Sequence, residues 1–336
     1  MKKGIGSLLL ICLVLLGFEL SIRTYLSLKY HSNFFKPQEI IFHYYPMVKE
    51  IKENYSEGPK KKILILSSSA LTDGWGGFAT VFDKELNKNG KEWDVYNASC
   101  VGFSSLDNLN TYTMLSDLKL DVLLFYNGIN DSRLNNCPPE IYKENYQHIA
   151  WNNEIATILS HPEINGSTIP FIIDFGFQKL KATFCKDCFI SENYHNQEKW
   201  QEYGSNFKSL ENFEKNIQAL IKTKPKESKL FLFSFATYVP DNYSFEKFVN
   251  KELDYNYHVN SREVEVWGKA PYVLDFMDSL NIILSAKQNP AKECYFIDIR
   301  NQVLQASNFA DICHYSAPGI EKVAQVISDS LTVRTN

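Results

Sequence analysis

The chain lacks the features that mark several protein classes. Only seven of its 336 residues are cysteines, too few for a fold held together by disulfides. Basic residues (35) do not outnumber acidic ones (39), so the charge indicates no nucleic-acid partner. P-loop, H-E-x-x-H, G-x-G-x-x-G and G-x-S-x-G motifs are absent. What remains is a composition of 44% apolar and 22% charged residues, which is typical of a globular protein.

Long apolar runs are also absent, apart from one near the N-terminus. Lys2 and Lys3 precede the apolar run Ile5–Phe18, and basic residues before such a run are typical of an export signal or a signal anchor. No small-residue cleavage site follows the run. We therefore expect residues 1–23 to form an uncleaved transmembrane anchor, with a cleaved signal peptide as the second interpretation. The rest of the chain is then expected outside the cytoplasm, in the periplasm or at the cell surface.

Two charged residues follow the run one helical turn apart. Extending the run to Ile22 gives a marginal span, in which Glu19 pairs with Arg23 at the membrane surface. Residues 24–60 mix aromatic with charged side chains and end in a Gly-Pro pair. We expect this segment to be a membrane-proximal stalk that is partly helical.

From residue 61 onward, short apolar runs alternate with helical patterns. Residues at i, i+3 and i+4 spacing predict helices over 210–221 and 323–331, the second with Pro318 near its start. This alternation predicts a parallel sheet with helices on both faces, a three-layer α/β/α sandwich in one domain, 61–336. Strands are expected at 62–66, 93–97, 121–126, 229–235 and 295–299.

One interval, about 132–226, is too long for a plain crossover, and we expect it to be an insertion that shapes a substrate pocket. Its aromatic residues suit either the insertion's own core, the commoner case, or the lining of a carbohydrate or acyl pocket. They are Tyr142, Tyr146, Trp151, Trp200 and Tyr203.

The cysteines allow more than one arrangement. Cys12 lies in the expected anchor, which leaves six in the domain. Cys185 and Cys188 form a C-x-x-C pair, but no second pair or histidine cluster completes a zinc site. In an exported domain a local disulfide, or two bridges to other cysteines, is favoured over redox catalysis. Cys100 and Cys313 either pair or simply pack.

Polar side chains gather in the loops that follow the expected strands, which is where parallel sheets bind ligands. Ser67–Ala70 follows the first strand, Asn97–Gly102 the second and Asn127–Asp131 the third, while Asp311–His314 precedes the last helix. These loops supply a hydroxyl, a glycine amide, a carboxamide and an Asp/His pair. Acyl transfer requires these groups as nucleophile, oxyanion donors, base and orienting residue.

The four blocks resemble those of the SGNH (GDSL-type) hydrolases, a family of flavodoxin-like α/β/α esterases and acyl-group enzymes. That family has a serine after strand one, a glycine after strand two, G-x-N-D after strand three and D-x-x-H before the final helix. Here the blocks read KILILSSSA, NASCVGFSS, YNGINDS and DICHYSAPG, in that order. The resemblance covers roughly residues 60–331, with its motif support confined to the four blocks.

The resemblance implies a role for each residue. Ser69 is the nucleophile, His314 the general base and acid, and Asp311 the residue that orients the histidine. The oxyanion donors are the backbone N–H groups of Ser69 and Gly102 and the side-chain amide of Asn130. No metal and no cofactor are implied.

The first block departs from the family pattern, because Ser67 and Ser68 stand where the family has Gly-Asp. Aligning the strand assigns the nucleophile to Ser69, with Ser68 as the alternative. The substituted Asp is not a triad residue, so its loss need not abolish catalysis. Glycine tolerates more backbone conformations than serine, so a serine at this position can alter the turn.

Three functions fit these residues. The first is a membrane-anchored serine esterase that removes acyl groups from an extracytoplasmic glycan, a lipid or a small ester. The second is an O-acyltransferase of an envelope polysaccharide, which uses the same triad. The third, suggested by the altered first block, is a catalytically inactive glycan-binding or assembly protein.

Overall fold

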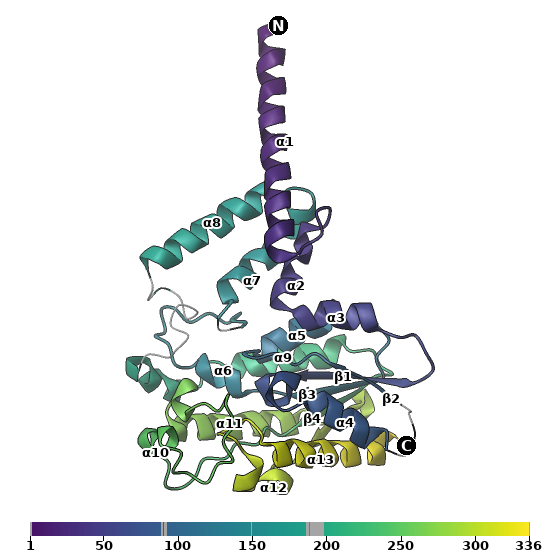
Figure 1. The fold of residues 1–336 in the computed structure, drawn as a ribbon, viewed down its shortest axis with the longest axis vertical. Helices are drawn as coiled ribbons and strands as arrows, with labels where there is room; N and C mark the ends of the chain where they lie inside the picture. Colours follow the sequence, from purple (N-terminus) through teal and green to yellow (C-terminus); the bar gives the residue numbers. More distant parts are fainter. Residues whose placement is uncertain are drawn as a thin grey trace.

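In the computed structural model, which describes residues 2–88, 90, 93–148, 150–185, 188 and 198–335, a single parallel sheet of five strands lies at the centre of the described chain (Figure 1). The strand order is β2-β1-β3-β4-β5, and every neighbouring pair is parallel. The strands are β1 (Lys61–Ser67), β2 (Trp93–Asn97), β3 (Val122–Tyr126), β4 (Lys229–Phe233) and β5 (Cys294–Ile297). All five lie within a few residues of the expected strands, and the expected α/β fold is confirmed.

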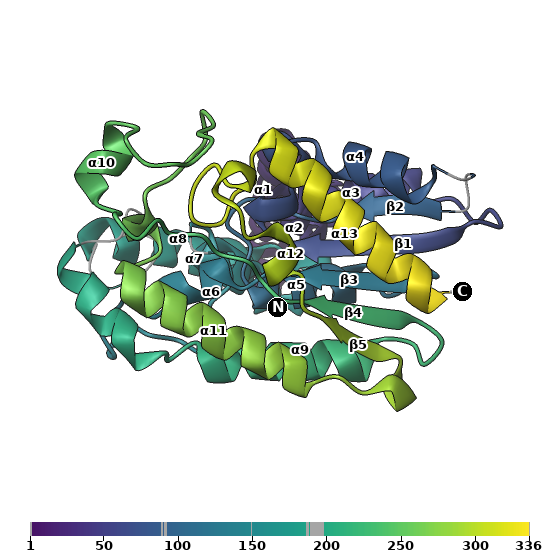
Figure 2. The same ribbon diagram turned by 90° about the horizontal axis from the view of Figure 1, so that it is seen from below.

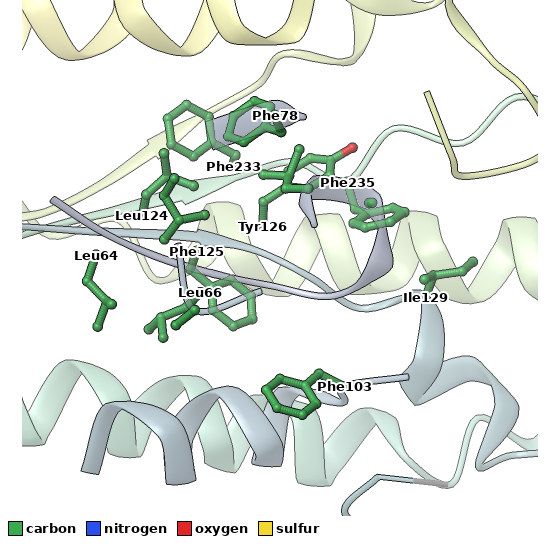
Figure 3. Packing of buried hydrophobic residues seen from close by; sticks show 14 of the residues in the cluster. Leu64, Leu66, Phe78, Phe103, Leu124, Phe125, Tyr126, Ile129, Phe233 and Phe235 are labelled. Atoms are coloured by element: carbon green, nitrogen blue, oxygen red, sulfur yellow. The ribbon is translucent and has the colours of Figure 1, made fainter. Parts of the chain in front are cut away.

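The inner strands form because their apolar runs are covered on both faces. Each residue of β3 is buried, and so are the last six residues of β1. Figure 3 shows Leu66 and Phe125 on the side of the sheet toward Phe103, with Phe78 and Phe233 on the opposite side. Each fully buried side chain of this size contributes roughly 1.5–3 kcal/mol. A continuous apolar run, rather than an alternating one, is what a strand with two covered faces requires.

Helices cover both faces of the sheet. Helices α4 (Phe78–Leu86) and α13 (Ala317–Thr335) pack against each other on one face, and α5 (Ser105–Met114) and α9 (Leu210–Thr223) on the other (Figures 1 and 2). Helix α11 (Ala270–Ala286) packs against α9, β4 and β5. Helices α9 and α13 match the two helices that periodicity predicts.

The shorter elements belong to the connections. The α-helices are α2 (Ile41–Tyr44), α3 (Pro46–Asn54), α6 (Ile129–Arg133), α7 (Asn152–Leu159), α8 (Ile169–Phe184), α10 (Phe245–Val249) and α12 (Arg300–Val303). The 3₁₀ helices are η1 (Pro37–Ile40), η2 (Ser69–Leu71), η3 (Asp73–Trp75), η4 (Pro162–Asn165), η7 (Glu198–Asn206), η8 (Val264–Val266), η9 (Pro290–Lys292) and η10 (Ala306–Asn308).

The N-terminal helix α1 (Lys2–Tyr30) projects away from the sheet (Figure 1). Within the described residues it is the one helix long and apolar enough to cross a membrane, over Gly6–Tyr30. Glu19 and Arg23 form the expected pair, with 2.6 Å between Oε1 and Nε.

The segment expected as a stalk, 24–60, is packed on the domain rather than extended from it. Tyr45 and Val48 are buried in the main core, and the Tyr45 hydroxyl lies 2.8 Å from the carboxylate of Asp107 on α5. The sequence does not reveal this because the apolar side chains of η1, α2 and α3 fall in short, interrupted elements.

The insertion is narrower than expected. Leu210–Thr223 is α9, a helix of the sandwich, so the part outside the three layers lies between α6 and α9. A small separate core forms within this part, with Tyr146 and Trp200 buried and Tyr142 and Tyr203 packed against them. Most of the insertion's aromatic residues therefore fill its own core, whereas Trp151 stacks on His148.

One disulfide joins Cys185 to Cys188, the local pairing among the expected alternatives. The C-x-x-C residues between them lie outside the described part of the chain. The other five cysteines, all in described positions, are free thiols, so Cys100 and Cys313 pack without pairing.

Candidate active site

The carboxyl ends of the strands bring the four sequence blocks together. Ser69 starts η2 directly after β1, Gly102 lies in the loop after β2, and Asn130 lies in α6 after β3. Asp311 and His314 precede α13. Ser69, Gly102, Asn130 and His314 line one cavity of about 390 Å³. All of the expected loops therefore contribute to a single site.

A hydrogen-bonded relay connects three of these residues. His314 Nε2 lies 2.8 Å from Ser69 Oγ, and His314 Nδ1 lies 2.7 Å from Asp311 Oδ2. Because an ionised carboxylate only accepts hydrogen bonds, Nδ1–H donates to Asp311 and Nε2 is left to accept from the serine hydroxyl. Asp311 is fully buried, and His314 and Ser69 are nearly so. This is the protonation state that a general base for Ser69 requires.

Backbone hydrogen bonds fix the Asp311 carboxylate. Its Oδ1 accepts from the N–H groups of Cys313 and His314, at 3.0 and 2.8 Å, and its Oδ2 accepts from the Arg262 N–H at 2.7 Å. These bonds fold the D-x-x-H segment into a turn that holds aspartate and histidine side by side. The Arg262 contact adds a segment between β4 and β5 that no sequence motif indicated.

Ser68 and Ser69 lie in different environments. Ser69 lines the cavity and touches His314. The Ser68 hydroxyl is buried and, among the described residues, has no hydrogen-bond partner. The geometry therefore favours Ser69 over Ser68 as the nucleophile.

The residues expected as oxyanion donors line the same cavity as Ser69 and His314. Asn130 Nδ2 donates one hydrogen to the Phe103 carbonyl at 3.0 Å, and its Oδ1 accepts from Trp267 Nε1 at 3.2 Å. These two bonds fix the plane of the amide, whose Nδ2 carries a second hydrogen. Gly102 has a φ of +80°, in the region that favours glycine. The backbone N–H of Gly102 therefore belongs to a turn that any other residue adopts only at a cost in free energy.

A histidine from the insertion supports this turn. Burial lowers the pKa of His148 to about 4, so the ring is neutral at pH 7. Its Nδ1 accepts from the Ala150 N–H at 3.1 Å, which leaves Nε2–H to donate to the Val101 carbonyl at 2.9 Å. No sequence motif indicates His148, because the residue lies outside all four blocks.

Replacing Gly102 by alanine is expected to impair both stability and activity. A Cβ at this position would lie 2.5 Å from His148 Nε2, on a backbone that costs a non-glycine residue about 1–2 kcal/mol. Displacing one oxyanion donor typically lowers kcat roughly 10²- to 10³-fold. Urea unfolding and ester kinetics measure the two effects. The double variant Gly102→Ala/His148→Ala should recover part of the stability that Gly102→Ala alone loses. If it recovers none, the clash with His148 is not the cause of that loss.

Two tryptophans that no motif indicated lie beside His314. The Trp75 ring lies 3.7 Å from the His314 ring, centroid to centroid, and the Trp267 ring lies 5.7 Å away. An aromatic face this close stabilises the imidazolium that forms when histidine takes a proton. Both tryptophans also line the cavity.

Beneath the site, a buried carboxyl group joins α6 to α5. Asp131 accepts hydrogen bonds from the backbone N–H and the hydroxyl of Ser105, at 3.0 and 2.6 Å. Burial, with the charge of Asp107 as a smaller contribution, raises the pKa of Asp131 to about 7. Burial likewise raises the pKa of Asp107 to about 6.

The raised pKa of Asp131 predicts that the fold loses stability as pH rises. A carboxyl of unfolded pKa near 3.9 and folded pKa near 7 binds its proton more tightly in the folded state. The associated stabilisation is present at low pH and is lost between about pH 4 and 7. Between pH 5 and pH 8 the free energy of unfolding, measured by urea titration, should fall by about 2.6 kcal/mol more in the wild type than in Asp131→Asn. An equal pH dependence in both proteins would contradict this assignment.

Three potential metal-ligating groups lie together at the site: Asp311, Cys313 and His314. Two ligands of a tetrahedral ion lie farther apart than the 2.7 Å between Asp311 Oδ2 and His314 Nδ1, which is a hydrogen-bond distance. Burial raises the pKa of the Cys313 thiol well above its usual value, which disfavours the thiolate that a metal binds. These groups therefore fit a catalytic relay better than a metal centre.

Serine, glycine, asparagine and the Asp/His pair occur along the chain in the order that the resemblance implies. At the sheet edge the strand order β2-β1-β3 places the Ser69 loop between the loops of Gly102 and Asn130.

Comparisons with known proteins add similarities of fold. No family model and no curated protein matches the chain. Among solved structures, TesA is 11% identical with a TM-score of 0.42, over 81% of this chain and 99% of that one. An extracellular lipase from Streptomyces rimosus is 11% identical with a TM-score of 0.42, over 80% and 99%. Est24, a carbohydrate acetylesterase from Sinorhizobium meliloti, is 10% identical with a TM-score of 0.37, over 82% and 99%. Similarities at this level carry no argument about activity.

Proposed function

We propose that the chain is a serine esterase that cleaves ester bonds through Ser69, His314 and Asp311. The observation that carries this proposal is the relay itself, with distances of 2.8 and 2.7 Å, at the wall of a cavity that Gly102 and Asn130 also line. Nucleophile, base, orienting carboxylate and oxyanion donors are the complete set for acyl transfer.

The reaction follows from the hydrogen bonds. Ser69 Oγ attacks the ester carbonyl carbon while its proton passes to His314 Nε2, and the carbonyl electron pair moves onto the oxygen. The N–H groups of Ser69 and Gly102 and the Asn130 amide stabilise that oxyanion. When the oxyanion collapses, the ester C–O bond breaks and the leaving alkoxide takes the proton from His314. Water, deprotonated by His314, then attacks the acyl-Ser69 carbonyl. When this second oxyanion collapses, the acyl–Oγ bond breaks, the acid is released and Ser69 Oγ takes the proton back from His314.

The cavity favours a polar acylated carrier, such as a glycan, over a long acyl chain. Its aromatic residues, Trp75, Phe245 and Trp267, provide faces on which a sugar ring packs. A long acyl chain would need a continuous apolar channel, whereas much of this lining is charged or carries an amide. Those lining residues are Arg133, Gln201, Arg262, Glu263 and Glu265.

We further propose that α1 anchors the enzyme in a membrane, with the catalytic domain outside the cytoplasm. Lys2 and Lys3 precede the apolar part of α1, and positive charge is retained on the cytoplasmic side of a span. The side chains from Leu8 to Phe18 are largely exposed, as expected of a helix that lipid surrounds.

A fluorophosphonate probe tests the catalytic proposal. The full chain in detergent should form one covalent adduct, located at Ser69 by peptide mass spectrometry. Absence of an adduct, with the protein folded, would favour a catalytically inactive binding or assembly protein and contradict the proposal.

Product analysis then distinguishes hydrolysis from transfer. An O-acetylated oligosaccharide is incubated with the enzyme, with and without an unacetylated acceptor. Free acetate at the same rate in both reactions supports the esterase. Acetylated acceptor in place of acetate would identify an O-acyltransferase, in which an alcohol rather than water resolves the acyl-enzyme.

A further inference from the structure

Helix α8, in the insertion, has two opposite apolar faces. One of them packs on the protein. Phe171 is fully buried and Phe175 packs against the main core, while Lys179 forms an ion pair with Glu154 of α7. In Figure 1, α7 lies between α8 and the sheet. The inner face of α8 therefore packs against other parts of this chain.

The outer face carries a stripe of large apolar side chains that are exposed. Ile173, Phe177, Leu180 and Phe184 are spaced by four, three and four residues, which places them on one side of a helix, opposite Phe171 and Phe175. They are 64%, 64%, 60% and 84% exposed. Single exposed apolar residues are ordinary, but a stripe of four along one helix marks an interaction surface.

The start of α8 is attached to α1. The Glu19 carboxylate accepts from the Thr168 backbone N–H at 2.9 Å and from the Ser167 hydroxyl at 3.2 Å. The Arg23 guanidinium donates to the carbonyls of Asn165 and Gly166, at 2.9 and 3.3 Å. The Glu19–Arg23 pair therefore holds the first turn of α8 against the N-terminal helix, from which α8 runs outward (Figure 1).

The length of the apolar run places this junction at the membrane surface. Ile5–Phe18 is 14 residues, or about 21 Å of helix. The hydrocarbon core of a bilayer is about 30 Å thick, so a span that starts at Ile5 reaches the level of Arg23. At that level the bilayer meets α8, whose outer face is apolar. The side chains of Glu19 and Arg23 are only 15% and 11% exposed, and they form an ion pair with each other at this level.

We propose that α8 lies in the membrane interface, with the stripe Ile173, Phe177, Leu180 and Phe184 embedded in lipid beside the α1 anchor. This inference goes beyond the proposed esterase function and rests on the proposed anchoring through α1. Lipid is the expected occupant because α1 and α8 are joined where the bilayer must end. An amphipathic helix at this depth inserts its apolar face among the acyl chains and keeps its charged flanks in the headgroups. The domain would then be attached at two points, which fixes its orientation on the membrane.

Photo-cross-linking of the full chain tests the inference. Three proteins are made, each with benzoylphenylalanine at one position. The positions are Phe177 of α8, Val14 of α1 and Ile282 of α11. Ile282 is 68% exposed, close to the 64% of Phe177. Its helix, α11, lies below the sheet in Figure 1, whereas α1 projects above it. The proteins are reconstituted in vesicles of phosphatidylcholine and phosphatidylglycerol and irradiated, and lipid adducts are counted by mass spectrometry.

The expected result is lipid adducts at positions 14 and 177, with at least a ten-fold lower yield at 282. Adducts at 14 but not at 177 would overturn the inference and leave the anchor standing. A protein–protein adduct at 177 would overturn it in favour of a second copy of this chain. Adducts at neither position would overturn both the inference and the anchoring. Fluorophosphonate labelling of each protein, measured in parallel, reports the catalytic proposal independently.

Discussion

Replacing Ser69 by alanine is expected to lower ester-cleaving activity roughly 10⁴- to 10⁶-fold, the range seen when a triad nucleophile is removed. The reason is the 2.8 Å contact between Ser69 Oγ and His314 Nε2, which alanine cannot make. Because the hydroxyl lies at a cavity wall and supports no other element through a described bond, the thermal midpoint should stay within a few degrees. Kinetics with a soluble short-chain ester and a melting curve of the full chain in detergent measure both quantities.

Ser68→Ala is the matched control. The Ser68 hydroxyl is buried and, among the described residues, without a hydrogen-bond partner. Removing an unsatisfied buried hydroxyl is close to neutral for stability, so this variant should keep nearly the full rate. If Ser68→Ala is inactive while Ser69→Ala retains activity, the nucleophile has been assigned to the wrong serine. If both retain activity, the relay is not catalytic.

The sequence was sufficient to predict the sheet and the loops that meet at its edge. The three inner strands, β1, β3 and β4, are apolar runs buried on both faces, such as Ile63–Leu66, and a pattern of this kind is local. Once the strands are parallel, their carboxyl ends share one edge, so the order of the loops predicts that Ser69, Gly102, Asn130 and His314 converge.

The rest of the site depends on contacts that are distant in sequence. The Arg262 N–H donates to Asp311, 49 residues away in sequence, and the Trp267 side chain donates to Asn130, 137 residues away. His148 supports the Gly102 turn from within the insertion. None of these residues belongs to a motif or a periodic pattern, so their roles emerge only from the packing. The same holds for Tyr45, whose hydrogen bond to Asp107 ties the expected stalk to the domain.

Asp311→Asn is expected to lower kcat by about 10⁴-fold, with a smaller loss of stability. Asp311 Oδ2 accepts from His314 Nδ1 and from the Arg262 N–H. If an amide nitrogen takes that position, it faces two donors, and His314 must move its proton to Nε2 so that Nδ1 accepts. The serine then meets an N–H rather than a lone pair, and His314 no longer removes its proton.

The alternative orientation of the asparagine is no better for the fold. Its amide nitrogen would then face the backbone N–H groups of Cys313 and His314, which now donate to Oδ1. Either way at least one buried donor loses its acceptor, at about 1–3 kcal/mol. Asp254→Asn is the matched control, because that carboxylate accepts a hydrogen bond from Tyr238 away from the cavity. Its kinetics should be unchanged. An Asp311→Asn enzyme that unfolds earlier yet keeps kcat within ten-fold of the wild type would make Asp311 a structural residue of the turn, with no part in orienting the base.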